Sequence, residues 1–177
     1  MKFCLLLSFL AWGVVSHKEA MAVGFMLETV DADSGKPIPC LIRFKGLGET
    51  TKPFPTKFLN RGTGLPKNHP ARQWLCFPGT GEIDIVTGNP TVEAIAGPEY
   101  EMAKKELRIK KGEDANVKLL LKRIANPRKA GWRSGNTHLH LNKMSRAQAD
   151  EYLRTVPASD GLELVFVSNL RREKDEE

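Results

Sequence analysis

The chain has 177 residues and 41% of them are hydrophobic, which is enough for one packed domain, or for one small domain and part of another. Its formal net charge is +6, but no dense Lys and Arg block with interleaved aromatic residues occurs. The excess charge is therefore typical of a solvated surface, and we expect no nucleic-acid partner.

The first 22 residues have the pattern of a secretory signal peptide. Lys2 precedes the apolar run "FCLLLSFLAWGVV", which is too short to span a bilayer, and Ala20 and Ala22 flank Met21 in a small-x-small cleavage pattern. We predict cleavage after Ala22, a secreted or periplasmic protein, and no stable membrane insertion afterwards. A retained N-terminal anchor is the alternative.

Export makes the cysteines informative. Cleavage would remove Cys4 and leave Cys40 and Cys76 in an oxidising compartment, where an even number of cysteines favours a disulfide. Both lie in strand-like apolar runs, where free buried thiols are equally common. The sequence leaves both interpretations open.

Residues 23 to 122 read as short strands separated by turns. "GFMLETVDADSGKPIPCLIRF" alternates, turns at Asp33-Ser34-Gly35, and resumes with Ile42 and Phe44 on one face. "WLCF", "EIDIV", "TVEAIA", "KELRI" and "NVKLLLKR" follow at regular spacing. Six or seven such strands predict a mainly β protein built on an antiparallel β-sandwich. Residues 46 to 73 show no period and predict a long loop.

The pattern changes beyond "ANPRKAGW". "THLHL" predicts a strand, Ser145 and Gln148 form a capping box for a helix that ends near Thr155, and "GLELVFV" predicts a strand covered on both faces. Strand, helix and strand make a βαβ unit, with a boundary near Asn126-Pro127. Trp132, which precedes the unit, is expected to be packed in a domain interface or at the base of a barrel.

His138 and His140 are the candidate site residues. In a strand, residues i and i+2 point to the same face, so the two imidazoles should lie side by side. Imidazole is the commonest protein ligand for zinc-like metals, although a third or fourth ligand must come from elsewhere. Taken alone, the pattern also fits two surface histidines that bind nothing.

The strand-rich part resembles a known family. "VDADSGKPIPCLIRF", "GEIDI" and "GPEYEMAKKELRIKKGEDANVKLLLKR" are similar to the carboxypeptidase-regulatory-like domain, a transthyretin-like sandwich in which an Asp-x-x-[ST]-Gly-x-Pro-[IL] turn joins the first two strands. One departure is "GNPTV", where the family has Gly-x-Tyr. The resemblance implies one sandwich domain over residues 23 to 125.

The next segment resembles a second family. "GWRSGNTHLHLN" is similar to the opening of the PHP (polymerase and histidinol phosphatase) metal-dependent hydrolases, whose first motif is Gly-Asp-x-His-x-His. A regulatory-like sandwich followed by this motif is the layout of the CehA/McbA-type metallohydrolases. The resemblance implies that His138 and His140 are the first ligands of a β/α barrel. Its divalent zinc, manganese or iron ions activate water to hydrolyse an ester, amide or phosphoester bond in a small-molecule substrate.

This sequence departs from the PHP pattern in two places. Asn136 replaces the usual Asp, and Ser168-Asn169-Leu170 stands where the family often shows Thr-Asp-His. Asn136 and Asn169 are therefore expected as accessory ligands at most, and Leu170 binds no metal.

The length of the second part limits what it can do. About 50 residues follow Pro127, whereas such a barrel needs on the order of 200 or more. We expect residues 130 to 177 to be a truncated PHP-like segment, and the chain to be the N-terminal portion of an exported metallohydrolase that is inactive by itself. The alternatives are a secreted non-catalytic sandwich that binds a partner or carbohydrate beside a vestigial barrel start, and a protein whose long loop mediates contacts.

Overall fold

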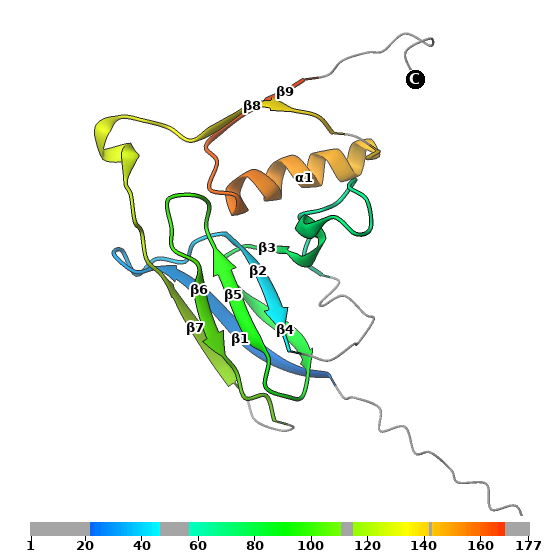
Figure 1. Cartoon of the computed structure of the whole chain (residues 1–177), viewed down its shortest axis with the longest axis vertical. Helices are drawn as coiled ribbons and strands as arrows, with labels where there is room; N and C mark the ends of the chain where they lie inside the picture. The colour runs from blue at the N-terminus through cyan, green and yellow to red at the C-terminus, as the bar shows by residue number, and fades with distance from the viewer. Residues whose placement is uncertain (1–21, 47–56, 111–114, 142, 169–177) are drawn as a thin grey trace, which may run out of the picture.

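The computed structural model describes residues 22–46, 57–110, 115–141 and 143–168. Residues 1–21 of the predicted 22-residue signal peptide, the accessory ligand Asn169 and its neighbour Leu170 lie outside the described residues. The described part is mainly β, with one α-helix near its C-terminal end, as the sequence predicts (Figure 1). None of its helices has the length and apolar character that crossing a membrane requires.

The first sheet contains three strands in the order β4-β1-β7: β1 (Ala22–Asp31), β4 (Thr80–Val86) and β7 (Ala115–Leu121). β1 pairs antiparallel with β4 but parallel with β7, over the register Phe25↔Ala115 to Asp31↔Leu121. The expectation of a purely antiparallel sandwich is therefore wrong at this pair. A parallel pair requires a crossover, and here the chain passes through the second sheet before β7 returns beside β1.

The second sheet contains four strands in the order β3-β2-β5-β6, and each pair is antiparallel. They are β2 (Cys40–Lys45), β3 (Leu75–Phe77), β5 (Thr91–Ile95) and β6 (Ala103–Glu106). β6 ends before the predicted "KELRI" strand is complete, because Leu107 and Ile109 turn into the core. With β1, β4 and β7 these strands make seven in the two sheets, which matches the predicted number.

The core lies between the two sheets and follows the alternation of the strands. Apolar residues two positions apart in β1, β4 and β7 are buried there, as the pattern predicts, and the second sheet contributes the opposite wall. Each large apolar side chain buried in this way stabilises the fold by about 1.5–3 kcal/mol. The main contributors are Phe25, Leu27, Ile83, Ile85, Val117, Leu119 and Leu121 from the first sheet, and Cys40, Ile42, Phe77, Val92 and Ala94 from the second.

The C-terminal unit contains β8 (Gly135–Leu139), α1 (Arg146–Ser159) and β9 (Leu164–Val167), and β8 and β9 pair in parallel. A short 3-10 turn, η2 (Pro127–Ala130), leads into it. Ser145 and Gln148 form the predicted capping box. The helix continues beyond the predicted end at Thr155 and includes Pro157, because the residues on either side of that proline, Val156 and Ser159, are buried against the sandwich.

Helix α1 lies between the β8–β9 pair and the sandwich (Figure 1). Tyr152 and Val156 pack with Cys76 of β3 in a second apolar cluster, together with Leu41, Leu59, Leu139, Leu141 and Met144. The helix covers a single face of β8–β9, so β9 remains exposed: Leu164 is 51% and Phe166 is 59% accessible. The expectation that this strand is covered on both faces is therefore wrong for the described residues.

Cys40 and Cys76 are both free thiols. Cys76 pairs with Leu41, the neighbour of Cys40, but the two sulfur atoms point to opposite faces of the sheet: Cys40 into the inter-sheet core and Cys76 toward α1. Burial raises the pKa of Cys40 to about 12 and that of Cys76 to about 11. Of the two interpretations left open by the sequence, the structure has the free buried thiols.

Candidate metal centre

The two histidines lie together at the carboxyl end of β8. His138 belongs to the strand and His140 follows its last residue, and both are exposed. Their ring centroids are 4.5 Å apart at an interplanar angle of 76°, and the two Nε2 atoms are 2.7 Å apart. The side-by-side placement that the alternation along a strand predicts is present, and both Nε2 atoms converge on one point.

This separation is close to the bite of a metal chelate. Two nitrogen ligands at about 2.0–2.1 Å from a metal, at about 90–110° to each other, lie roughly 2.9–3.4 Å apart. The observed 2.7 Å is the length of an N–H···N hydrogen bond between the rings. The pair has to open by only a few tenths of an ångström to hold an ion.

The end of β9 supplies a second contact. The N–H of Ser168 donates to the carbonyl of Leu139 at 2.9 Å, which brings its Oγ to 3.2 Å from Nδ1 of His138. The carboxyl ends of both parallel strands thus meet at the histidine pair, and in open α/β sheets this is the edge where ligands bind. Comparison with the PHP pattern marks Ser168 as part of a departure at the end of the second strand, but it does not predict this contact, because 30 residues separate Ser168 from His138.

The described residues contain no group of three or more His, Cys, Asp or Glu side chains that would hold a metal. Asn136, the expected accessory ligand, uses its Oδ1 to accept a hydrogen bond from the backbone N–H of His138 at 2.9 Å. Within the described chain, His138 and His140 fit a divalent transition metal as a bidentate pair. Two ligands do not define a hydrolytic centre, which needs at least three protein ligands and an open position for water.

A second candidate lies where the sandwich meets α1. An open hollow of about 390 Å³ is lined by Leu41, Arg61, Pro70, Ala71, Trp74, Ile95, Gly97 and Asp160. It lies beside a short 3-10 turn, η1 (Pro70–Gln73). The Arg43 guanidinium stacks 4.3 Å from the Trp74 ring centroid, and Arg61 forms a two-point ion pair with Asp160 at 2.8 and 2.9 Å. No sequence pattern marks this hollow, because separate segments of the chain line it.

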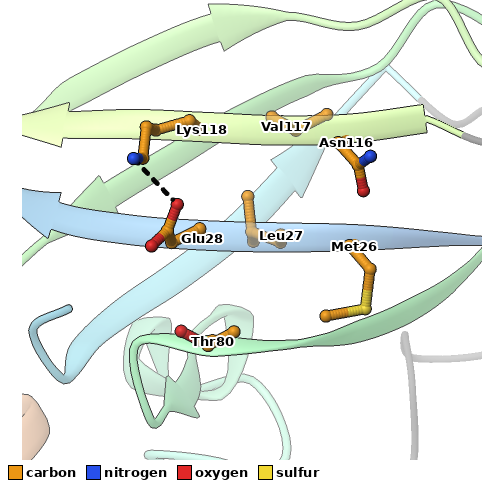
Figure 2. Close-up of a pocket in the computed structure, with 7 residues that line it drawn as sticks. All are labelled: Met26, Leu27, Glu28, Thr80, Asn116, Val117 and Lys118. Atoms are coloured by element: carbon orange, nitrogen blue, oxygen red, sulfur yellow. Dashed lines mark ion pairs between the residues drawn. The ribbon is translucent and has the colours of Figure 1, made fainter.

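The outer face of the first sheet carries a smaller hollow of about 260 Å³ across β4, β1 and β7 (Figure 2). Its two charged lining residues, Glu28 and Lys118, form an ion pair at 3.0 Å. The other lining side chains are Met26, Leu27, Thr80, Asn116 and Val117. The two charges satisfy each other at the surface, and no buried polar group among the described lining residues marks a ligand site in this hollow.

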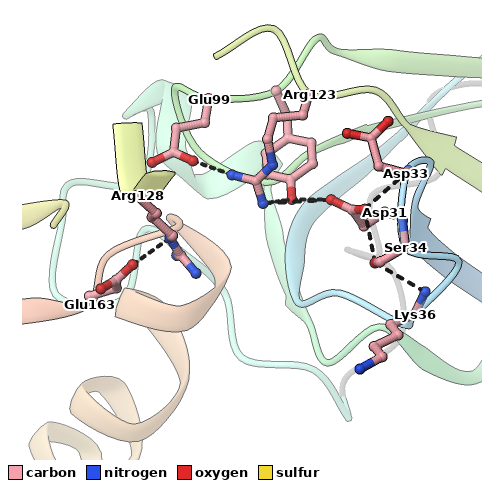
Figure 3. Close-up of polar contacts among 9 residues, drawn as sticks. Asp31, Asp33, Ser34, Lys36, Glu99, Arg123, Arg128 and Glu163 are labelled. Atoms are coloured by element: carbon pink, nitrogen blue, oxygen red, sulfur yellow. Dashed lines mark hydrogen bonds and ion pairs between the residues drawn. The ribbon is translucent and has the colours of Figure 1, made fainter. Parts of the chain in front are cut away.

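A polar network at the ends of β1 and β7 has a structural role (Figure 3). The Tyr100 hydroxyl donates to Asp31 at 2.6 Å, and Arg123 contacts Glu99, Tyr100 and Asp31. The hydrogen bond from Tyr100 lowers the pKa of Asp31 to about 2. All these groups have protein partners, so the network joins strand ends and offers no free reactive group.

The segment after this network is tied to β9 by ion pairs. Arg128 and Arg133 both contact Glu163, which directly precedes β9, and Figure 3 shows the first of these pairs. Trp132 lies between them in the sequence but is 70% exposed. The expectation that Trp132 is packed in a domain interface or at a barrel base is therefore wrong, because the ion pairs rather than its indole hold this segment.

No protein-family profile matches the sequence, and no curated protein does either. Among solved structures, the chain is similar to a minor pilin of the Gram-positive pathogen Streptococcus agalactiae, with 18% sequence identity and a TM-score of 0.38. The match covers 60% of this chain and spans 47% of the pilin chain. This distant likeness concerns the β-sandwich fold alone.

Proposed function

We propose that this chain is the N-terminal portion of an exported metal-dependent hydrolase of the PHP superfamily, with a carboxypeptidase-regulatory-like sandwich, and that His138 and His140 bind one divalent transition-metal ion. The observation that carries the proposal is the convergence of the two Nε2 atoms, 2.7 Å apart, at the carboxyl end of a parallel strand. The motif "GNTHLHLN" and the order of the two parts support the same assignment.

Within this proposal the chain's own residues bind the metal ion and hold its ligands in place. His138 and His140 supply two neutral nitrogen ligands, and the β8–β9 pairing fixes the strand end that carries them. A bound zinc, manganese or iron ion supplies Lewis acidity and a water of lowered pKa. Because the described residues contribute two ligands, we expect weak binding and no hydrolysis by this chain alone.

The second candidate is a secreted, non-catalytic sandwich that binds a partner or a carbohydrate. The hollow beside Trp74 favours it, because a partly buried indole next to the paired charges of Arg61 and Asp160 is the mixture of apolar and polar groups that small-molecule sites use. The two candidates differ in the residues that they require, so mutation separates them.

Zinc titration of the whole chain by calorimetry tests the first candidate. We expect the variant with both His138→Ala and His140→Ala to lose at least tenfold in affinity, because it lacks both ligands. His69→Ala removes an exposed imidazole at the N-cap of η1 and is the matched control, with unchanged affinity expected. Ester and phosphoester model substrates should show no turnover.

Two results would contradict this picture in different ways. Equal zinc affinity in the wild type and the double variant would exclude His138 and His140 as ligands. Tight binding together with hydrolysis, both lost in the double variant, would show that the short chain is itself a working enzyme.

A further inference from the structure

The position of Ser168 follows from strand pairing and not from local sequence. Its backbone N–H donates to the carbonyl of Leu139, the residue between the two histidines, at 2.9 Å. This bond places the end of β9 beside the end of β8 and sets the Ser168 Oγ 3.2 Å from Nδ1 of His138. The hydroxyl therefore faces the ring nitrogen that points away from His140.

The two ring nitrogens of His138 thus have different partners. Nε2 faces Nε2 of His140 at 2.7 Å, and Nδ1 faces the Ser168 hydroxyl. A neutral imidazole carries one ring proton, and the hydrogen bond made by one nitrogen sets which nitrogen remains free for a metal. A hydroxyl can accept a bond from an N–H at this position, whereas a methyl group cannot.

We propose that Ser168 is a positioning residue for the histidine pair: it accepts a hydrogen bond from Nδ1–H of His138 and keeps the lone pair of Nε2 directed at the metal position. The proposal rests on the metal-binding function proposed above. In the metal-free chain, Nε2–H of His140 donates to Nε2 of His138. Metal binding then requires one proton movement, from Nε2 to Nδ1 of His140, while the ring of His138 stays as it is.

Three variants of the full chain test the role of Ser168. Ser168→Ala removes the acceptor, and Ser168→Thr keeps a hydroxyl at the same place. Ser134→Ala is the matched control, because Ser134 Oγ donates to the Gly161 carbonyl at 2.6 Å in the same unit without contacting a histidine. Far-ultraviolet circular dichroism checks that each variant keeps its fold.

The first measurement is made without metal, by long-range ¹H–¹⁵N NMR of the imidazole rings. We expect Nδ1 of His138 to be protonated in the wild type and in Ser168→Thr, and the population to move toward Nε2–H in Ser168→Ala. The His69 ring serves as an internal reference, and its tautomer should be the same in all variants. In Ser134→Ala the tautomer of His138 should be the same as in the wild type. An unchanged His138 tautomer in Ser168→Ala would overturn the proposal.

The second measurement is zinc affinity. Loss of an outer-shell partner of a metal-binding histidine costs about 10–100-fold in affinity, so we expect a loss in this range for Ser168→Ala and recovery in Ser168→Thr. If the wild type binds zinc and Ser168→Ala binds it equally well, the positioning role is wrong although the proposed function stands. If the wild type binds no zinc, the proposed function fails, and the metal-free tautomer alone decides the role of Ser168.

Discussion

The sandwich and the C-terminal unit are stabilised in different ways. Seventeen buried residues form the core of the sandwich in the part of the chain that the structure describes, and they come from both of its sheets and from the connections between their strands. The second cluster has three buried members, of which only Tyr152 and Val156 belong to the C-terminal unit. Both point to the outer face of β2 and β3, so the unit obtains its burial from the sandwich, whereas the sandwich has a core of its own.

The contact between the two regions is close at the level of the backbone. Gly97, after β5, and Gly161, after α1, have φ angles of 77° and 72°, which favour glycine. A Cβ atom at Gly97 would lie 2.4 Å from the carbonyl oxygen of Asp160. The end of α1 therefore rests directly on the turn after β5, and side chains at either glycine would separate the two regions.

Truncating a buried side chain in each region should give the largest difference between the sandwich and the C-terminal unit in free energy of unfolding. Phe77 is 0% exposed inside the sandwich, and Phe77→Ala should lower the free energy of unfolding by about 3–5 kcal/mol. Val156→Ala removes two methyl groups at the outer cluster and should cost about 1–3 kcal/mol. Urea denaturation measures both values, and hydrogen exchange should locate the second loss in α1. If Val156→Ala lowered hydrogen-exchange protection equally in α1 and throughout the sandwich, the sandwich would not be stabilised independently of the C-terminal unit.

The Asp31–Tyr100 pair predicts an acid-dependent part of the stability of the sandwich. The hydrogen bond from Tyr100 is the main reason that the pKa of Asp31 falls from its ordinary 3.8 to about 2. A carboxylate whose folded pKa is lowered stabilises the fold fully above its unfolded pKa and loses that contribution as pH falls toward 2. The contribution is on the order of 2 kcal/mol at neutral pH, and Tyr100→Phe should remove the largest single part of it, while the Ser34 hydrogen bonds and the Arg123 charge keep the rest.

The measurement is the free energy of unfolding of the wild type and Tyr100→Phe between pH 7 and pH 2. The pKa of Glu93 is also lowered: burial raises it, but Arg43, Lys45 and Lys104 together lower it to about 2. Glu93 is unchanged in both proteins, so the difference between the two curves isolates Asp31. The curves should approach each other as pH falls through about 4 and converge near pH 2. Parallel curves over the whole range would show that Tyr100 does not set this pKa.

The sequence predicted those features of the fold that depend on local pattern. Alternation gave the buried faces of β1 and β7, and the Ser145 and Gln148 spacing gave the start of α1. The parallel pairing of β1 with β7 was missed, because alternation fixes which face of a strand is buried but not which strand lies beside it. The exposure of β9 was missed for a related reason: an apolar run shows what a strand could bury, not what is present to cover it.

The candidate site, like the fold, could be predicted from the sequence only where it depends on local pattern. His138 and His140 could be paired from their spacing alone, since residues i and i+2 share a face. The sequence marks Ser168 only as part of a departure from the PHP pattern, and its contact with His138 required the register of β8 with β9, which no pattern in either strand specifies. Arg61 and Asp160 are 99 residues apart, and their pairing follows from how the helix packs on the sandwich.

The ion pair between Arg61 and Asp160 joins the sandwich to the end of α1. Breaking it should have the smallest effect on stability of the changes considered, and the effect should be confined to the C-terminal unit. The guanidinium contacts both carboxylate oxygens of Asp160 at 2.8 and 2.9 Å, and it also donates to the Tyr152 hydroxyl at 2.9 Å. The side chains of Arg61 and Asp160 are 27% and 17% exposed, so solvent screens the pair in part. We expect Arg61→Ala to cost about 1 kcal/mol, mainly as loss of α1 protection from hydrogen exchange.

Arg61→Lys is the matched control for this test, because it keeps the positive charge but not the planar fork that binds both oxygens of Asp160 at once. If geometry holds the helix, Arg61→Lys should lose nearly as much α1 protection as Arg61→Ala; if charge alone matters, it should resemble the wild type. In either case the amides of β1 and β7 should keep their protection, since these strands belong to the first sheet and their core does not involve α1. Loss of protection in β1 and β7 together with α1 would mean that the two regions unfold as one unit, and the sandwich would then depend on the C-terminal unit as much as the reverse.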